Sequence, residues 1–213
     1  MMPTTMTAQA QDPYLAATPY IQSDAPEIQA LAASLTGATP QETAVALFNW
    51  VRDNILYDPQ AAADPRSFYP ATAVLARGRG YCVQKAVLLA ALTRAAGIPT
   101  RLGFADVRNH QIPERLKRLM GTDLFVFHGY VQLRLGGRWV KATPAFDPDT
   151  SHKSNALPVE LDGENDAMMH PVDPEGHPHI TYVRDRGHYA DLPYEEIWET
   201  FQEVYPLLKK LLD

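Results

Sequence analysis

Apolar positions recur at helical spacing in the first half of the chain. Between residues 82 and 96 they fall at 86, 89, 92 and 96, in steps of three and four, and the run stops at Gly97. This spacing predicts an amphipathic helix closed by a left-handed glycine. Because Gly78 and Gly80 interrupt any earlier helix, Cys82 is predicted to lie in the first turn.

The same spacing predicts further helices on both sides of this run. Thr39, Pro40 and Glu42 form a capping box that opens a helix to about residue 56. An earlier helix is predicted near residues 24–36, short ones at 71–76 and 110–121, and a last one at 193–211.

Alternating apolar and polar positions follow the central helix. They predict strands at 100–107, 124–135 and 138–143, with further strands at 157–161 and 179–184. Adjacent glycines at 136 and 137 predict a two-residue hairpin turn. Helices followed by antiparallel strands favour an α+β domain.

Composition narrows the class of protein. The 213 residues carry a net charge of −6 without a basic block, which argues against a nucleic-acid partner. No secretory signal and no run of membrane-spanning length is recognised, so a cytoplasmic protein without membrane contact is the expectation. Residues 1–20 are interpreted as a flexible leader and 21–213 as a single domain, with a Pro-rich extension from about residue 148. No oligomeric state is predicted.

Cys82 is the single cysteine, which excludes an internal disulfide framework. At a helix N-terminus, backbone N–H groups without helical partners stabilise a thiolate or an oxyanion formed beside it. A buried, unreactive thiol is the equally simple alternative.

His128 stands out among the seven histidines through the predicted hairpin. If Leu135 faces Arg138, positions 143 and 147 are diagonal neighbours of His128 and within reach of a longer side chain. Asp147 is then a plausible partner that orients the imidazole, giving a Cys82–His128–Asp147 relay. The alternative is an ordinary strand histidine and a turn aspartate.

Four segments together resemble the transglutaminase-like superfamily. They are Gly80–Cys82, Arg94–Arg101, Phe127–Val131 and Gly137–Pro144, in the family's order and spacing, and the resemblance covers about 39–150. It implies a papain-like α+β fold, in which a catalytic cysteine at a helix N-terminus packs on an antiparallel sheet that bears the histidine.

The resemblance also implies a chemistry, namely attack on an amide carbonyl of a peptide or other amide substrate through a thioester acyl-enzyme. Water as acceptor gives an amidase or protease, and a lysine amine gives a cross-linking transamidase. Beside the Cys82 N–H, the oxyanion or substrate candidates are Gln84, Tyr69 and Tyr81.

This sequence departs from the family at one position. The family's second strand normally ends in Asp-Pro, whereas this chain has Thr143 before Pro144. Asp147 is interpreted as a displaced acid, with Thr143 as the alternative partner of His128. A non-catalytic peptide-binding module that keeps the fold is the rival hypothesis.

A second polar group lies near the C-terminal end. His170, Asp173, His177 and His179 have side chains that ligate metals. They are interpreted as parts of a Pro-rich surface loop, because no helix or strand spacing fixes them as ligands. No metal and no cofactor is therefore expected, and a metal-dependent hydrolase is kept as a third hypothesis.

Overall fold

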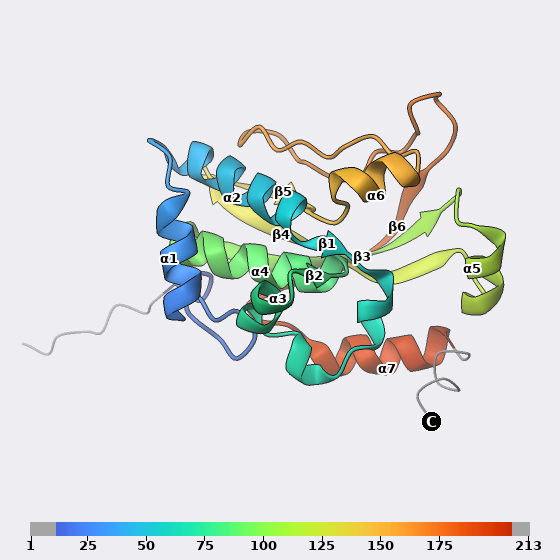
Figure 1. The fold of residues 1–213 in the computed structure, drawn as a ribbon, viewed down its shortest axis with the longest axis horizontal. Helices are drawn as coiled ribbons and strands as arrows, with labels where there is room; N and C mark the ends of the chain where they lie inside the picture. Colours follow the sequence, from blue (N-terminus) through green and yellow to red (C-terminus); the bar gives the residue numbers. More distant parts are fainter. Residues whose placement is uncertain (1–11, 206–213) are drawn as a thin grey trace, which may run out of the picture.

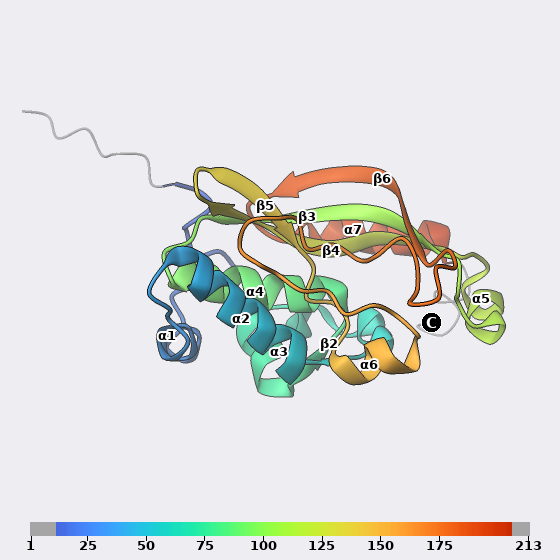
Figure 2. The same cartoon turned by 90° about the horizontal axis from the view of Figure 1, so that it is seen from above.

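A four-stranded antiparallel sheet forms one layer of the fold, and helices α1 to α4 form the other (Figures 1 and 2). The computed structural model describes residues 12–205. The strand order is β5-β4-β3-β6. The strands are β3 (Thr100–Asn109), β4 (Leu124–Leu135), β5 (Arg138–Ala142) and β6 (Ile180–Tyr189).

The helices lie mainly in the first half of the chain. They are α1 (Pro26–Ser34), α2 (Pro40–Asn54), α3 (Ala71–Arg77), α4 (Cys82–Ala95), α5 (Glu114–Met120), α6 (Pro148–Lys153) and α7 (Tyr194–Val204). Between α2 and α4 the chain forms β1 (Leu56–Tyr57), two 3-10 turns (Pro59–Ala63 and Arg66–Phe68) and β2 (Arg79–Gly80), with β1 and β2 paired in parallel. Thr39 caps α2 by accepting the Glu42 N–H, which is one half of the predicted capping box, whereas the Glu42 carboxylate accepts the N–H of Ala38 rather than that of Thr39.

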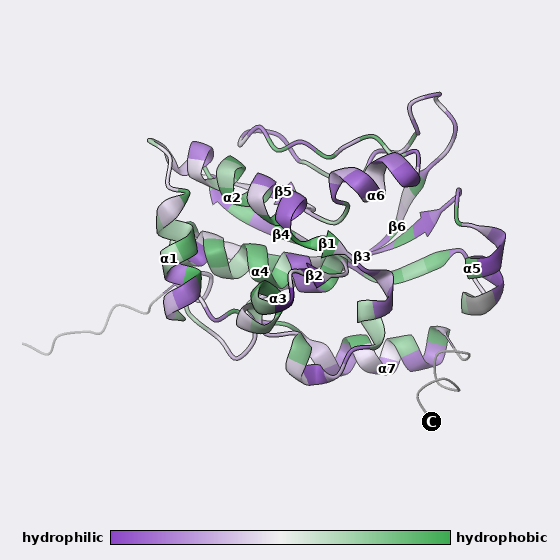
Figure 3. Ribbon diagram, viewed as in Figure 1, coloured by the Kyte–Doolittle hydropathy of each residue, from purple (hydrophilic) through white to green (hydrophobic). Residues whose placement is uncertain are grey.

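The central helix α4 is buried on every side from Cys82 to Arg94. The sequence predicted burial of only one face of this helix, so the buried surface is wider than predicted. Figure 3 shows α4 as mostly hydrophobic, in contrast to the hydrophilic α6. Two charged residues of α4 are buried with their donors satisfied. Lys85 Nζ donates to the Ile55 carbonyl at the end of α2, and Arg94 Nε donates to the Thr100 carbonyl.

The hairpin has the predicted register, with Leu135 opposite Arg138 and Val131 opposite Ala142. β5 ends there, because the Thr143 N–H donates to the Ala167 carbonyl and the chain turns away from β4. The predicted strand at 157–161 is wrong, since these residues form a loop, and the last strand runs over 180–189.

The chain before α1 is held against the sheet where the structure describes it. The Tyr14 ring packs edge-on against Trp139, and the Tyr14 carbonyl accepts the Thr100 N–H. The rest of the expected leader, residues 1–11, lies outside the described residues, as does the end of the last predicted helix. Within residues 12–205, no helix has the length and apolar character needed to cross a membrane.

Candidate active site

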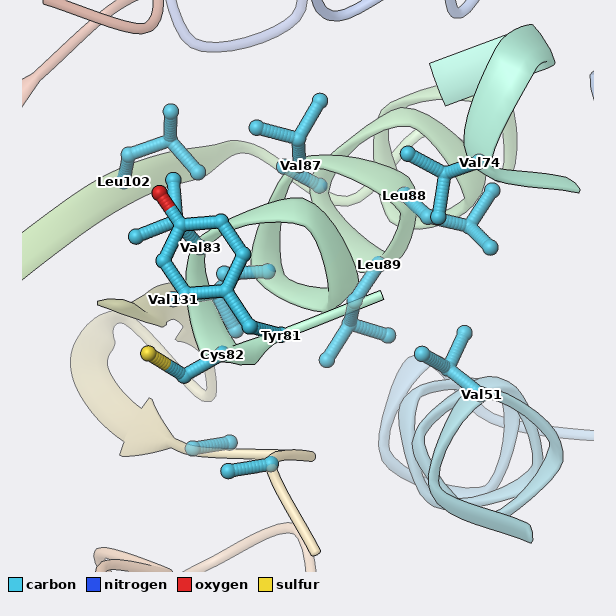
Figure 4. Close-up of a cluster of buried hydrophobic side chains, with 14 of the residues drawn as sticks. Val51, Val74, Tyr81, Cys82, Val83, Val87, Leu88, Leu89, Leu102 and Val131 are labelled. Carbon is cyan, nitrogen blue, oxygen red and sulfur yellow. The ribbon is translucent and has the colours of Figure 1, made fainter. Parts of the chain in front are cut away.

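Cys82 is the first residue of α4, as the glycines upstream predict. Gly78 closes α3 with φ of 63°, and Tyr81 occupies the N-cap of α4. The Gln84 side chain holds this first turn, because its Oε1 accepts the Tyr81 N–H at 3.2 Å. Figure 4 shows the Cys82 sulfur leaving the start of the helix and pointing away from Val51 and Leu88. The thiol therefore lies at the end of the helix where backbone N–H groups are free.

Burial dominates the electrostatics of this thiol. It raises the pKa of Cys82 to about 11, against the opposing effect of hydrogen bonds from the backbone N–H groups of Gly129, Val83 and Cys82 itself. The proton accordingly stays on the sulfur at neutral pH in this geometry. The same three N–H groups would stabilise negative charge that develops on or beside the sulfur.

The Gly129 N–H reaches the sulfur because β5 is short. Alternate residues of β4 direct their N–H groups to the β5 side, and Val131 has the last partner, Ala142. Gly129 is the next residue on that side, and its N–H is turned to Cys82 instead. A side chain at this position would be excluded, since a Cβ would lie 2.7 Å from Val83 Cα. Glycine thus permits the close approach of β4 to the start of α4.

His128 is the residue before Gly129 in the sequence. Its side chain is buried, with 5% of its surface exposed. Its Nε2 lies 3.1 Å from Thr143 Oγ1, and that hydroxyl lies 3.4 Å from the Gly129 carbonyl oxygen. If the hydroxyl donates to the carbonyl, Nε2–H donates to Oγ1 and Nδ1 keeps the lone pair that a base requires. Burial lowers the pKa of His128 to about 4, so the ring is neutral in this geometry.

The His128 imidazole has an aromatic neighbour on β6. The Tyr182 ring packs edge-on against the His128 ring, with centroids 6.1 Å apart. Burial raises the pKa of the Tyr182 hydroxyl, and the charge of a Cys82 thiolate adds to that rise. His128 thus lies on the part of β4 that contacts both β6 and, through Gly129, the start of α4.

The strand is deformed just before His128. Phe127 has φ of 54°, a left-handed conformation that costs a bulky residue energy, and the register of β3 against β4 shifts here. The Asp106 carboxylate accepts the Phe127 N–H at 3.2 Å and forms an ion pair with Arg186. The Tyr205 hydroxyl accepts the N–H of Val126 at 2.8 Å. These side chains hold the bulge that carries His128.

Sequence analysis missed this support around the bulge. Asp106 lies in a run of apolar strand residues, and a buried acid there is itself a signal, because such an acid needs a partner. Nothing in the sequence indicates that the partners are Arg186 and the Phe127 amide, more than 20 residues away.

The interpretation of Asp147 as the partner of His128 needs correction. Its carboxylate caps α6 and accepts the Thr150 N–H at 2.8 Å, while Oδ2 accepts the Tyr57 N–H at 2.6 Å. Burial acts to raise the pKa of Asp147, but these hydrogen bonds outweigh it and hold the pKa below its usual value. Thr143, the alternative, is the residue whose side chain lies against the imidazole.

The side chains considered as oxyanion donors form hydrogen bonds to other groups of the protein. Gln84 Nε2 donates to the Phe68 carbonyl, and the Tyr69 hydroxyl donates to the Ala62 carbonyl. The Tyr81 hydroxyl lies 3.3 Å from that of Tyr69. These three residues surround Cys82 and the first turn of α4. The remaining candidates for oxyanion donors are the backbone N–H groups of Gly129, Val83 and Cys82.

The C-terminal polar group lies in a separate place. Asp173 and His177 are brought together, with Oδ2 and Nδ1 3.2 Å apart, and Glu175 joins them although the sequence did not single it out. The His170 ring lies elsewhere, against the Pro158 carbonyl.

The fold and the placement of these residues define a class. Helices packed on an antiparallel sheet form a papain-like α+β arrangement, with a cysteine opening the central helix and a histidine on the facing strand. The Transglutaminase-like superfamily model matches residues 29–144, and the chain belongs to this superfamily. The expected family and fold class are thereby confirmed.

The solved structures to which this chain is similar are distant in sequence. A putative cysteine protease from Cytophaga hutchinsonii is 21% identical with a TM-score of 0.50, over 84% of this chain and 46% of that one. A putative protease from Parabacteroides distasonis is 17% identical with a TM-score of 0.39, over 68% of this chain and 28% of that one. The chain thus spans less than half the length of either protein. No curated protein matches the sequence.

Proposed function

We propose that this chain is a cysteine hydrolase that cleaves amide bonds in peptide-like substrates. Cys82 is the nucleophile, His128 the base and Thr143 the residue that orients the imidazole. One observation carries the proposal, namely that Cys82 opens α4 where Gly129, the residue after His128, packs against Val83. The name of the structural neighbour from Cytophaga hutchinsonii, a putative cysteine protease, agrees with this class of enzyme.

The reaction follows from these positions. The thiol proton passes to His128 as the sulfur attacks the amide carbonyl, and the N–H groups of Cys82 and Gly129 stabilise the oxyanion. The C–N bond then breaks, and the imidazolium gives its proton to the leaving amine. Water, deprotonated by the same ring, attacks the thioester and releases the acid and the thiol. An amine in place of water gives transamidation.

A non-catalytic binding module is the rival, and two observations favour it. Burial leaves the thiol with a raised pKa and the imidazole with a lowered one, so neither is charged at rest. In addition, Thr143 provides a hydroxyl where an acid would stabilise the imidazolium. A module of this kind would bind peptides without forming a covalent intermediate.

Alkylation of Cys82 by iodoacetamide across pH tests the role of the base. We expect His128→Ala to slow the reaction below pH 8 and to leave a profile governed by the thiol alone. Tyr14→Phe, at the opposite end of the sheet, is the control and should react like the wild type. Identical profiles for His128→Ala and the wild type would remove His128 from the mechanism.

Intact-mass analysis with activated ester and peptide amide substrates tests the covalent step. We expect an adduct on the wild type that is absent from Cys82→Ala. Added lysine then separates hydrolysis from transfer, because only a transferase forms the amide product in preference to the free acid. Binding without any adduct would support the binding module instead.

A further inference from the structure

The loop before β6 forms a tight turn that gathers three metal-ligating side chains. An isolated bridge between Val172 and Pro178 closes the turn, and the Asp173 N–H donates to the His177 carbonyl. Asp173, Glu175 and His177 each offer one ligand atom, and these atoms lie within 4.8 Å of one another. They alternate along the chain, so the turn directs all three side chains to one side.

The spacing of these atoms suits a small divalent cation. Zinc binds nitrogen and carboxylate oxygen at about 2.0–2.2 Å, so two ligands of a tetrahedral ion lie about 3.4 Å apart. The distance from Asp173 Oδ2 to His177 Nδ1 is 3.2 Å, close to that value. An ion could therefore replace this hydrogen bond without a large movement of either side chain.

Both carboxylates are oriented by amides from other parts of the chain. Gln111 Nε2 donates to Asp173 Oδ2 at 2.9 Å, and Asn155 Nδ2 donates to Glu175 Oε2 at 2.6 Å. Asp173 Oδ1 accepts backbone N–H groups of its own turn, including that of His177 at 2.8 Å. Partners that fix the orientation of ligating carboxylates are typical of protein metal sites.

The cluster borders a hollow in the surface. An open hollow of about 450 Å³, lined by His110, Gln111, Asp173, His177 and Pro178, gives access from solvent.

We propose that Asp173, Glu175 and His177 bind one divalent transition-metal ion of the zinc class, with the remaining coordination position open to the hollow. An imidazole in the set favours zinc over calcium and magnesium, which prefer all-oxygen sites. The site is separate from Cys82. Bound metal would stabilise the 172–178 turn. This turn leads into β6, whose Tyr182 packs against His128.

Isothermal titration of the tag-free full chain with ZnCl2, after removal of metal by a chelator, tests the proposal. We expect one ion per chain with a Kd below about 10 µM, and at least tenfold weaker binding to His177→Ala and to Glu175→Gln. His152→Ala, an exposed histidine on α6, is the matched control and should bind like the wild type. Titration with CaCl2 and MgCl2 should give much weaker binding.

Two results would overturn the proposal. One is the absence of stoichiometric zinc binding by folded wild-type protein. The other is binding that His177→Ala and Glu175→Gln leave unchanged, which would place the ion elsewhere. Because Glu175 and His177 are exposed, both variants are expected to fold, and circular dichroism of each metal-free variant checks this. The visible spectrum of bound Co²⁺ reports the coordination number independently.

Discussion

Replacing Gly129 by alanine tests the close approach of β4 to the start of α4. The new Cβ would lie 2.7 Å from Val83 Cα and 3.1 Å from Val83 N, and both are backbone atoms that cannot rotate away. Ordinary contact begins at 3.4 Å, so the helix start must move by about 0.7 Å. Overpacking of this kind costs about 1–3 kcal/mol of the free energy of unfolding.

The same movement lengthens the hydrogen bond from the Gly129 N–H to the Cys82 sulfur. A hydrogen bond to a charged group contributes about 1.5–3 kcal/mol, which corresponds to a rise of about 1–2 units in the pKa of the thiol. The thiolate fraction at a given pH therefore falls about 10- to 100-fold. Two assays measure the two effects, urea unfolding for stability and the rate of iodoacetamide alkylation between pH 7 and pH 10 for the thiol.

Gly137→Ala separates a general loss of stability from the effect on the thiol. Gly137 lies at the hairpin tip with φ of 81°, and a Cβ added there would meet no atom within 4 Å, so alanine costs about 1–2 kcal/mol through backbone strain alone. We expect this control to lose stability and to keep the wild-type alkylation profile. Wild-type stability together with a wild-type alkylation profile in Gly129→Ala would refute the reasoning.

Three further substitutions address the surrounding residues. Thr143→Val keeps the shape but removes the hydroxyl at Nε2, so alkylation below pH 8 should slow toward the His128→Ala rate, while Thr143→Ser should restore it. Asp106→Ala leaves the largely buried Arg186 without its partner and should cost about 3–5 kcal/mol in urea unfolding, whereas Asp106→Asn, which keeps an acceptor, should cost less. Asp147→Asn should cost about 1–2 kcal/mol at pH 7. Because the folded pKa of Asp147 is lowered, its carboxylate stabilises the fold above the unfolded value of about 3.9, and the difference from wild type should shrink as pH falls below it.

The hairpin could be predicted because its signals are local. Gly136 and Gly137 both adopt positive φ, which fixes the turn, and the turn fixes the register of the two strands beside it. That register correctly made Thr143 a neighbour of His128. The start of α4 could be predicted for the same reason, since Gly78 closes the preceding helix at the expected place.

Asp147 was misplaced because its position depends on a distant residue. The hairpin count assumes that the second strand continues past Ala142, but the Ala167 carbonyl captures the Thr143 N–H and draws the chain away. Asp147 then caps α6, which begins at Pro148, and binds the Tyr57 amide. Aspartate before proline is typical of a helix N-cap, whereas the alternative considered for Asp147 was only a turn residue.

The burial of α4 on all sides also depends on distant partners. The polar side chains of residues 84, 85 and 94 are buried, and each donates to a carbonyl group of another segment. Lys85 illustrates the energetic cost of burying a charged side chain. Burial lowers its pKa to about 7, and the Asp147 carboxylate acts in the opposite direction. Asp147 therefore supports the helix that carries Cys82 without touching His128.

The neutral state of the thiol and the imidazole constrains any mechanism that uses them. Proton transfer from Cys82 to His128 creates two opposite charges in a buried region, and their mutual attraction is strong where water is excluded. The N–H groups of Gly129 and Val83 stabilise the negative charge, whereas only the Thr143 hydroxyl acts on the far side of the ring. The pair should therefore ionise as the carbonyl is attacked rather than beforehand. An enzyme of this kind reacts more slowly with iodoacetamide, where His128 acts as a base without a bound acyl group, than with a bound acyl donor, while a binding module reacts slowly with both.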